Sequence, residues 1–279
     1  METDATGPGL ETRAAALDRL LEGMGRIAVA VSGGVDSLTL ATIAHRLPAA
    51  ACEMFHAVSP AVPPDATDRV REQARRQGWI LHVVDAGEFG DERYLANPVD
   101  RCFHCKTHLY AAIAGRTDAT LVSGTNTDDL GEYRPGLDAA ARHGVRHPYV
   151  EAGIGKADLR RLARRLGMPE VAALPSSPCL ASRVETGIGI RPDVLPLVDA
   201  AEKIVAREIA PGTVRCRLRG RGIVIELDAG ALRVLTPASR ERLGEKIAAL
   251  FSGTGVAAGV DFAAYRTGSA FIGIRHERI

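Results

Sequence analysis

The segment of residues 32–37, Ser-Gly-Gly-Val-Asp-Ser, has the composition of a phosphate-binding loop. It lies between an apolar run at 27–31 and an amphipathic stretch at 37–46, so we expect it to join a buried strand to a helix. At such a junction, backbone N–H groups and the helix dipole stabilise a polyphosphate. The segment lacks the Lys-Ser or Lys-Thr ending of a Walker A loop, which argues against γ-phosphate transfer of that type. The expected phosphate-binding residues are Ser32, Gly33, Gly34, Asp36 and Ser37.

Two acidic residues, Asp128 and Asp129, follow another apolar run at 120–122. If that run is a strand of the same parallel sheet, its carboxyl end lies near the phosphate-binding segment. Asp129 is therefore our candidate for a contact with magnesium or with the nucleotide. The alternative for both segments is simpler, because glycine, serine and acidic residues are also common where helices begin.

Three of the five cysteines stand where they could do chemistry. Cys102 and Cys105 are separated by two residues at the start of an expected helix, and Cys179 lies in a Pro- and Ser-rich segment at 175–183. Three thiolates can bind a [4Fe–4S] cluster with one iron left open, or they can form a zinc site together with His108. The spacing alone leaves both alternatives open.

Arg215 and Arg217 alternate with Cys216 along an expected strand. Side chains two residues apart on a strand project to the same face, so the two guanidinium groups suit a phosphate-bearing substrate. The Cys216 thiol then faces the other way and is interpreted as a packing residue, as is Cys52 in an earlier apolar run. The alternative is that both arginines are solvated charges.

The order of apolar and helical stretches predicts how these residues are positioned. Apolar runs suited to buried strands recur at 27–31, 51–58, 80–84, 120–122 and 145–150. Helical stretches lie around 14–21 and at 37–46, 66–77, 104–115, 134–143 and 156–167. This alternation predicts an α/β fold, a doubly wound parallel sheet with helices on both faces and ligands at the carboxyl ends of its strands.

After residue 190 the order of elements changes. The sequence predicts a helix at 192–208, paired strands at 214–219 and 222–227, a helix at 237–251 and then two strands. This pattern is typical of a smaller α+β domain. Gly187 and Gly189 loosen the chain before it, so we expect one domain at residues 1–187 and a second at 188–279.

The composition excludes several classes of protein. The chain has 279 residues, of which 46% are hydrophobic, enough for one large or two ordinary domains. Lys and Arg number 35 against 34 Asp and Glu, so no overall field favours nucleic acid or an acidic membrane. The longest uncharged run, 247–260, is too short and glycine-broken to span a bilayer. Residues 1–9 do not resemble a secretory signal and the cysteines are few, so we expect a cytoplasmic protein.

The pattern at 32–37 resembles the signature of the PP-loop ATP pyrophosphatases. Those enzymes cut ATP between the α and β phosphates and adenylate a carbonyl or carboxylate. The resemblance implies ATP and Mg²⁺, with Asp36 helping to place the ion and Ser37 binding phosphate. Adenylation gives a carboxylate a leaving group, AMP, in place of oxide, and we expect cationic groups and a divalent ion to assist it.

Three more segments resemble the LarE family: Asn-Pro with Arg-Cys-x-x-Cys-Lys at 97–106, Ser-Gly-Thr-Asn-Thr-Asp-Asp with Tyr-Arg-Pro-Gly at 123–136, and Ser-Pro-Cys-Leu-Ala-Ser-Arg at 177–183. LarE-type proteins are ATP-dependent sulfur transferases of nickel-pincer nucleotide synthesis. They convert pyridinium-3,5-biscarboxylic acid mononucleotide to its bis-thiocarboxylate, and adenylation precedes sulfur delivery. The resemblance implies a small-molecule nucleotide substrate and sulfur-donor or cofactor-pathway partner proteins. We also expect a homo-oligomer.

The resemblance leaves two sulfur sources open. Some members sacrifice the cysteine that matches Cys179 and leave dehydroalanine, whereas members with the Cys-x-x-Cys pair look built to carry a cluster. Because all three cysteines are present, we favour a [4Fe–4S] cluster on Cys102, Cys105 and Cys179 with an extra sulfide as donor. Sacrifice of Cys179 is the alternative.

The resemblance also implies roles for residues around Cys179. A neighbouring cation lowers a thiol pKa or holds phosphate, and Ser182 and Arg183 suit that role. Glu202 is implied as a metal ligand or base, and the resemblance supports Arg215 and Arg217 as phosphate ligands. The sequence departs from the family pattern at 184–187, where a Pro-Tyr-Gly-like turn is usual, and at Glu132, where aspartate is usual.

Other functions remain as alternatives. A tRNA thiolation enzyme would need a basic surface, and the Arg-rich stretch at 156–165 has a core-facing side, so its arginines look like ordinary solvated charges. An amide-forming synthetase would leave the three thiols without a role, and a nucleotide sensor would not need Asp36, Asp129 and Cys179. The sulfur-transfer hypothesis requires that Cys179 and the segment 32–37 open into one chamber.

Overall fold

The computed structural model describes residues 8–48, 50–131, 134–257 and 259–272. The chain forms two compact units: the first comprises Met1–Ser59, Pro64–Glu88 and Cys102–Ser177, and the second Pro60–Pro63, Phe89–Arg101 and Pro178–Ile279. The expected domain boundary after residue 187 falls within the second unit and stays a prediction. The predictions made from residues 1–7, about a secretory signal, and from Glu132 and Tyr133, in the motif at 123–136, fall outside the described part.

The first unit is built on a four-stranded parallel sheet in the order β3-β2-β1-β4. Its strands are β1 (Arg26–Ala30), β2 (Ala51–Ala57), β3 (Leu81–Val84) and β4 (Thr120–Ser123). They coincide closely with four of the predicted apolar runs, and the predicted α/β fold class is confirmed.

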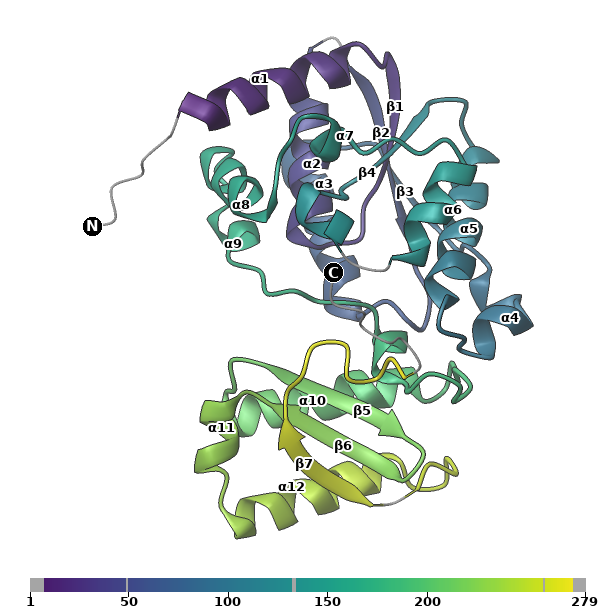
Figure 1. Cartoon of the computed structure of the whole chain (residues 1–279), viewed down its shortest axis with the longest axis vertical. Coiled ribbons are helices and arrows are strands. Elements are labelled where there is room, and N and C mark those ends of the chain that lie inside the picture. Colours follow the sequence, from purple (N-terminus) through teal and green to yellow (C-terminus); the bar gives the residue numbers. More distant parts are fainter. Residues whose placement is uncertain (1–7, 49, 132–133, 258, 273–279) are drawn as a thin grey trace. The chain divides into compact units, whose positions relative to one another are not determined.

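Helices cover both faces of this sheet (Figure 1). Ile27 and Val29 of β1 point to one face and pack with residues of α1 (Pro8–Glu22), α2 (Val35–Arg46), α3 (Pro64–Gln77), α8 (Lys156–Arg165) and α9 (Pro169–Ala172). Ala28, between them, points to the other face, which α5 (Arg101–Ala114) and α6 (Pro135–Arg142) cover. The alternation along β1 therefore divides the core into two layers.

The expected strand at 145–150 is wrong. Only an isolated bridge pairs Arg146 with Val122 of β4, and the chain then turns into the short helix α7 (Pro148–Glu151). Pro148 stands at the first helical position, where its missing N–H costs nothing, whereas in a strand it would remove a ladder hydrogen bond. The apolar run continues the sheet for one residue and then ends it.

The strand order places a topological switch point between β1 and β4. From β1 the chain proceeds to β2 on one side, while β4 lies on the other. In such sheets the crevice at the carboxyl ends of the two central strands is where ligands bind. The segments that leave β1 and β4, residues 32–37 and 124–129, are the two that the sequence analysis selected.

The second unit contains a mixed sheet in the order β5-β6-β7 (Figure 1). β5 (Val214–Arg219) and β6 (Gly222–Leu227) form the predicted antiparallel pair, and β7 (Val260–Ala264) adds in parallel. Its helices are α4 (Glu92–Leu95), α10 (Leu195–Ile209), α11 (Ala229–Val234) and α12 (Pro237–Leu250). One of the two strands expected after α12 is present in the described part, and residues 273–279 lie outside it.

Single-turn 3₁₀ helices lie at η1 (Glu88–Gly90), η2 (Thr127–Gly131) and η3 (Leu180–Arg183). η2 contains Asp128 and Asp129, and η3 contains Ser182 and Arg183. These candidate site residues therefore lie on short 3₁₀ helices. Among the described helices, none has the length and apolar character needed to cross a membrane.

His56, at the end of β2, makes the stability of the first unit depend on pH. Its buried ring bonds the Val31 carbonyl through Nδ1 at 2.8 Å and the Thr67 hydroxyl through Nε2 at 2.9 Å. A carbonyl only accepts, so Nδ1 carries the proton and Nε2 accepts from Thr67. Burial lowers the pKa of His56 below its usual value of 6.5, although the bond to Val31 opposes this.

We therefore expect the free energy of unfolding to fall as the pH falls below about 6.5, because the unfolded chain then binds a proton that the folded chain resists. His56→Gln should cost about 1 kcal/mol at neutral pH through a lost hydrogen bond, yet make the urea midpoint less dependent on pH between about 7.5 and about 5.5. Equal pH slopes for the two proteins would contradict this.

Candidate active site

The segment 32–37, the candidate phosphate-binding segment, is a preformed loop between β1 and α2. Gly33 has φ +84°, and a Cβ there would lie 2.6 Å from the Ala66 carbonyl oxygen, so only glycine fits. The Ser32 N–H donates to Ser37 Oγ at 3.0 Å, and Arg69 Nε donates to the Gly33 carbonyl at 3.1 Å. The main chain of the loop is thus held before any phosphate arrives.

Asp36 has the environment of a cation ligand. Its Oδ2 pairs with Lys156 Nζ at 2.5 Å, while its buried Oδ1 has no hydrogen-bond partner in the described part of the chain. Burial raises the pKa of Asp36 and the nearby Asp129 charge adds to this, against the effect of Lys156. A buried carboxylate oxygen without a partner is costly, and a hard divalent cation such as Mg²⁺ would satisfy it.

The segment after β4 closes on this loop. A Cβ on Gly124 would lie 2.9 Å from the Ser37 backbone nitrogen, so glycine permits the contact. Asp129 pairs with Arg134 at 2.9 Å and is near enough to Asp36 to affect its pKa. Asp128 has a different role, because its Oδ2 accepts the Lys156 N–H at 2.5 Å at the first residue of α8. The structure thus brings Asp36 and Asp129 together.

Sequence reasoning missed three residues of this site. Lys156 pairs with Asp36, and the Tyr149 hydroxyl donates to the Asp36 carbonyl at 3.1 Å. His147 bonds Ser123 Oγ through Nδ1 at 2.9 Å at the end of β4, and burial lowers its pKa. His147 and Tyr149 lie in the stretch 145–150, which the sequence analysis wrongly assigned to a strand. Lys156 is the first residue of α8, a helix whose arginines drew attention instead. No local sequence pattern marks any of the three.

In the second unit, Cys179 is exposed and stands immediately before η3. Its carbonyl accepts from the Ser182 N–H at 3.0 Å, and the next N–H, of Leu180, donates to the Ala61 carbonyl at 2.8 Å. The main chain around the thiol is therefore held on both sides. Ser182 and Arg183 are buried beneath it, so the residues expected beside Cys179 are adjacent to it in space.

Arg183 and Glu202 form a buried two-pronged ion pair. Arg183 Nε and Nη2 donate to the two carboxylate oxygens of Glu202 at 2.9 and 3.0 Å. Burial lowers the pKa of Arg183, but the hydrogen bond and charge of Glu202 outweigh it and the pKa is raised overall. The guanidinium therefore stays charged. The expected role of Glu202 as a metal ligand or base stays a prediction.

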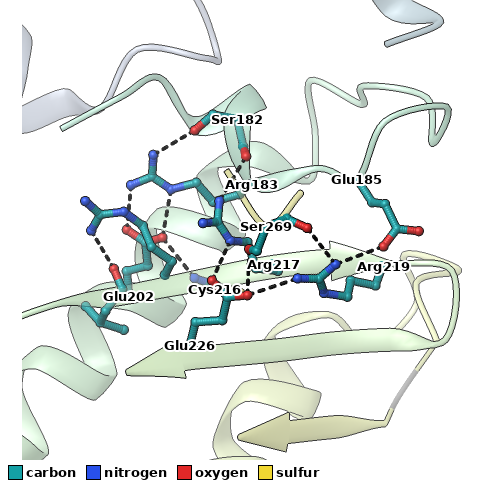
Figure 2. A network of polar contacts seen from close by, with 11 residues as sticks. Ser182, Arg183, Glu185, Glu202, Cys216, Arg217, Arg219, Glu226 and Ser269 are labelled. Carbon is teal, nitrogen blue, oxygen red and sulfur yellow. Dashed lines mark hydrogen bonds and ion pairs between the residues drawn. The ribbon is translucent and has the colours of Figure 1, made fainter. Parts of the chain in front are cut away.

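The two candidate arginines of β5 differ in burial: Arg217 is buried and Arg215 is half-buried. Arg217 Nε donates to Glu226 at 3.0 Å and its Nη1 to the Ser182 carbonyl at 3.1 Å, in a site almost without exposure (Figure 2). Arg215 lies over the Tyr265 ring, and burial together with the Arg183 charge lowers its pKa. A phosphate role for either arginine stays a prediction.

Cys216 lies between the two arginines and is fully buried. Burial strongly raises the pKa of its thiol, and the Glu202 charge adds to this. An un-ionised buried thiol is a packing group, in agreement with its expected role.

Cys102 and Cys105 are the second and fifth residues of α5, half-buried and in the first unit, whereas Cys179 belongs to the second. Arg101, just before them, is buried, donates to Asn97 Oδ1 at 2.6 Å and stacks on Phe271. Within the described residues, no set of three or more His, Cys, Asp or Glu side chains is arranged to hold a metal ion. The cluster and the zinc alternative with His108 stay predictions.

Comparison with known proteins places the chain in a family. A scan of protein-family models finds no match. An uncharacterized protein of Synechocystis sp. is 33% identical over 222 residues, 78% of this chain and 82% of that protein. Pyridinium-3,5-bisthiocarboxylic acid mononucleotide synthase of Lactiplantibacillus plantarum is 29% identical over 225 residues, 78% of this chain and 80% of the synthase. The chain belongs to the LarE family.

A third relative of this LarE-family chain, an uncharacterized protein of Methanocaldococcus jannaschii, is 25% identical over 214 residues, 75% of this chain and 81% of that protein. The resemblance found from motifs is thus confirmed at the level of the family. The tRNA alternative gains no support from α8, because Arg161 pairs with Asp158 at 2.6 Å and Arg165 with Glu11 at 2.7 Å.

Gly124 offers a direct test of how the two loops meet. Gly124→Ala should lower the free energy of unfolding by about 1–3 kcal/mol, because the new methyl group must push β4 away from the start of α2. A matched control is Gly90→Ala, where a Cβ meets nothing within 4 Å, and it should change stability by less than about 0.5 kcal/mol. Equal urea denaturation curves for both variants would refute the close approach.

Proposed function

We propose that this protein is an ATP-dependent sulfur transferase that adenylates the carboxylates of pyridinium-3,5-biscarboxylic acid mononucleotide and inserts sulfur to give thiocarboxylates. The name of the Lactiplantibacillus plantarum relative, a pyridinium-3,5-bisthiocarboxylic acid mononucleotide synthase, supports this product. The observation that carries the proposal is the preformed loop at 32–37, in which a buried oxygen of Asp36 lacks a partner among the described residues, in a chain that also presents the exposed Cys179. A small-molecule nucleotide is the substrate that follows from it.

The first step uses the groups of the first unit. Backbone N–H groups of the loop and the start of α2 bind the triphosphate, and Lys156 adds a positive charge beside them. Asp36 and Asp129 are the residues that would hold Mg²⁺, which supplies charge neutralisation at the phosphate oxygens. A substrate carboxylate oxygen attacks the α-phosphorus, the bond to the bridging oxygen breaks, and pyrophosphate leaves with that electron pair.

The second step exchanges AMP for sulfur. In the route through Cys179, the thiolate attacks the carbonyl carbon of the adenylate, a C–S bond forms and AMP leaves. A base then removes the Cα proton, the Cβ–S bond breaks, and thiocarboxylate and dehydroalanine remain. A [4Fe–4S] cluster on Cys102, Cys105 and Cys179 would supply sulfide instead. The chemistry of three thiols suits a cluster, but no three such side chains are arranged to hold a metal ion among the described residues.

One experiment tests the function and separates the sulfur sources. The protein is purified without oxygen, its iron and sulfide are measured, and ATP, Mg²⁺ and the biscarboxylate nucleotide are added. Thiocarboxylate with iron present and unchanged protein mass supports the cluster. Thiocarboxylate with protein lighter by the elements of hydrogen sulfide, and without iron, supports sacrifice of Cys179. Absence of thiocarboxylate from the reaction refutes the proposed function.

Asp36→Asn should lower substrate-dependent pyrophosphate release by about 100-fold or more, because the amide binds a divalent cation poorly where charge must be neutralised. The matched control on the same unit is Asp118→Asn, since Asp118 is highly exposed and pairs with Arg26 in the described part of the chain. Release would be followed with a coupled pyrophosphate assay. A similar rate for both variants would remove Asp36 from the chemistry.

A further inference from the structure

Glu202, on α10, has both carboxylate oxygens engaged. Its Oε1 accepts from Arg183 Nε and from the Cys216 N–H of β5, each at 2.9 Å, and its Oε2 accepts from Arg183 Nη2 at 3.0 Å (Figure 2). The side chains of Glu202 and Arg183 are only 13% and 3% exposed. A metal ion at Glu202 would have to break a buried charged pair. The contacts of Glu202 are those of a residue that binds and orients the Arg183 guanidinium.

The third guanidinium nitrogen of Arg183, Nη1, donates hydrogen bonds to the main chain on both sides of the Cys179 Cα. Nη1 donates to the Pro178 carbonyl at 2.6 Å and to the Cys179 carbonyl at 3.2 Å, with Ser182 Oγ at 3.1 Å. These two carbonyls belong to the two planar peptide groups that flank the Cys179 Cα. Because each peptide group is rigid, fixing both restricts rotation on either side of that Cα. The direction of the Cα–Cβ bond of Cys179 is then fixed as well.

The same short segment has a second buried support. Arg217 donates to the Ser182 carbonyl while paired with Glu226, which also accepts from Arg219 at 2.9 Å and from Ser269 at 2.6 Å. The Cys179 side chain itself is exposed. The result is an exposed thiol on an immobilised main chain, and the chain of contacts that orients it begins at Glu202.

We propose that Glu202 is a positioning residue that acts through Arg183 to fix the direction of the Cys179 thiol, and that it does not bind a metal ion. The proposal rests on the proposed function in one respect, that Cys179 is the residue which meets the activated carboxylate. Bond formation requires the reacting atoms at about 3–3.5 Å and in line. A thiol on a freely rotating main chain would rarely satisfy that requirement.

The charge of Glu202 is as necessary as its geometry. Arg183 is a buried cation, and Glu202 is the acidic group that pairs with it in the described part of the chain. Removing one partner of a buried pair leaves the other charge uncompensated. In Glu202→Ala the guanidinium must draw in water or leave its position, and it then releases the Pro178 and Cys179 carbonyls.

The first test needs no substrate. Hydrogen exchange followed by mass spectrometry would compare the peptide covering 178–184 in the full-length wild type, Glu202→Ala and Glu208→Gln. The amides of Leu180 and Ser182 should exchange about tenfold faster or more in Glu202→Ala. The control on the same helix, Glu208, pairs with Arg242 and Lys246 away from this segment, and should leave the exchange unchanged. Unchanged exchange in Glu202→Ala would overturn the proposal.

The second test is a double-mutant cycle on sulfur transfer. Because a sacrificed Cys179 reacts only once, kcat is measured here as the single-turnover rate constant at saturating substrate, and KM as the substrate concentration at half that rate. Glu202→Ala should lower this kcat by about 10- to 100-fold and change KM by less than about threefold, because orientation of the thiol acts on the chemical step. If Glu202 works through Arg183, the double variant with Arg183→Ala should be no slower than Arg183→Ala alone. Multiplied losses, or recovery of Glu202→Ala by added divalent metal, would overturn the proposal.

Two further variants separate positioning from stability. Glu202→Gln keeps the shape and one acceptor, so its kcat should fall between wild type and Glu202→Ala. Leu243→Ala removes a fully buried side chain of α12 in the same unit, and it should destabilise the protein without lowering kcat. A similar kcat loss in Leu243→Ala would show that stability alone explains the effect. If the wild type forms no thiocarboxylate, the proposed function fails, while the exchange experiment still decides the positioning claim.

Discussion

The close approach of the chain segments that leave β1 and β4 is the constraint on which the first unit depends. Two adjacent parallel strands whose connections run to opposite sides leave a crevice at their carboxyl ends. Here Gly124 permits the approach, because a Cβ on it would collide with backbone atoms of Asp36 and Ser37, whereas Gly33 allows the first segment to pass close to Ala66 of α3. Beside this contact Asp36 is partly buried, its Oδ1 has no partner among the described residues, and Asp129 lies near enough to raise its pKa. The electrostatic demand for a cation follows from packing.

In the second unit, buried ion pairs fix the conformation of the segment that carries Cys179. Arg183 with Glu202 and Arg217 with Glu226 are both nearly inaccessible to solvent, an arrangement that costs desolvation and contributes little net stability. What such pairs provide is a fixed direction for each guanidinium, and both guanidinium groups donate to carbonyls of the segment 178–182. The pairs therefore specify the conformation of the segment that carries Cys179.

Local patterns were sufficient for the strands of the first sheet, for the pair β5 and β6, for the longer helices and for the loop at 32–37, because hydrophobic period, glycine and turn chemistry act over a few residues. They did not predict the short helices α4, α9 and α11. They failed at 145–150, where Pro148 ended a run that its composition alone would continue. They could not pair Lys156 with Asp36, which lies 120 positions earlier, since periodicity does not tell which distant side chains meet. Nor could they tell that Glu202 and Arg217 have buried partners, because the choice of partner belongs to the tertiary fold.

The central claim is that the protein activates a carboxylate as its adenylate before sulfur arrives. The most direct measurement uses substrate whose carboxylate oxygens carry a heavy isotope, with the fate of the label followed by mass spectrometry after reaction with ATP. The account predicts one labelled oxygen in each AMP released, because the carboxylate oxygen becomes part of its phosphate. Label in pyrophosphate or inorganic phosphate, or thiocarboxylate formed with unlabelled AMP, would contradict it.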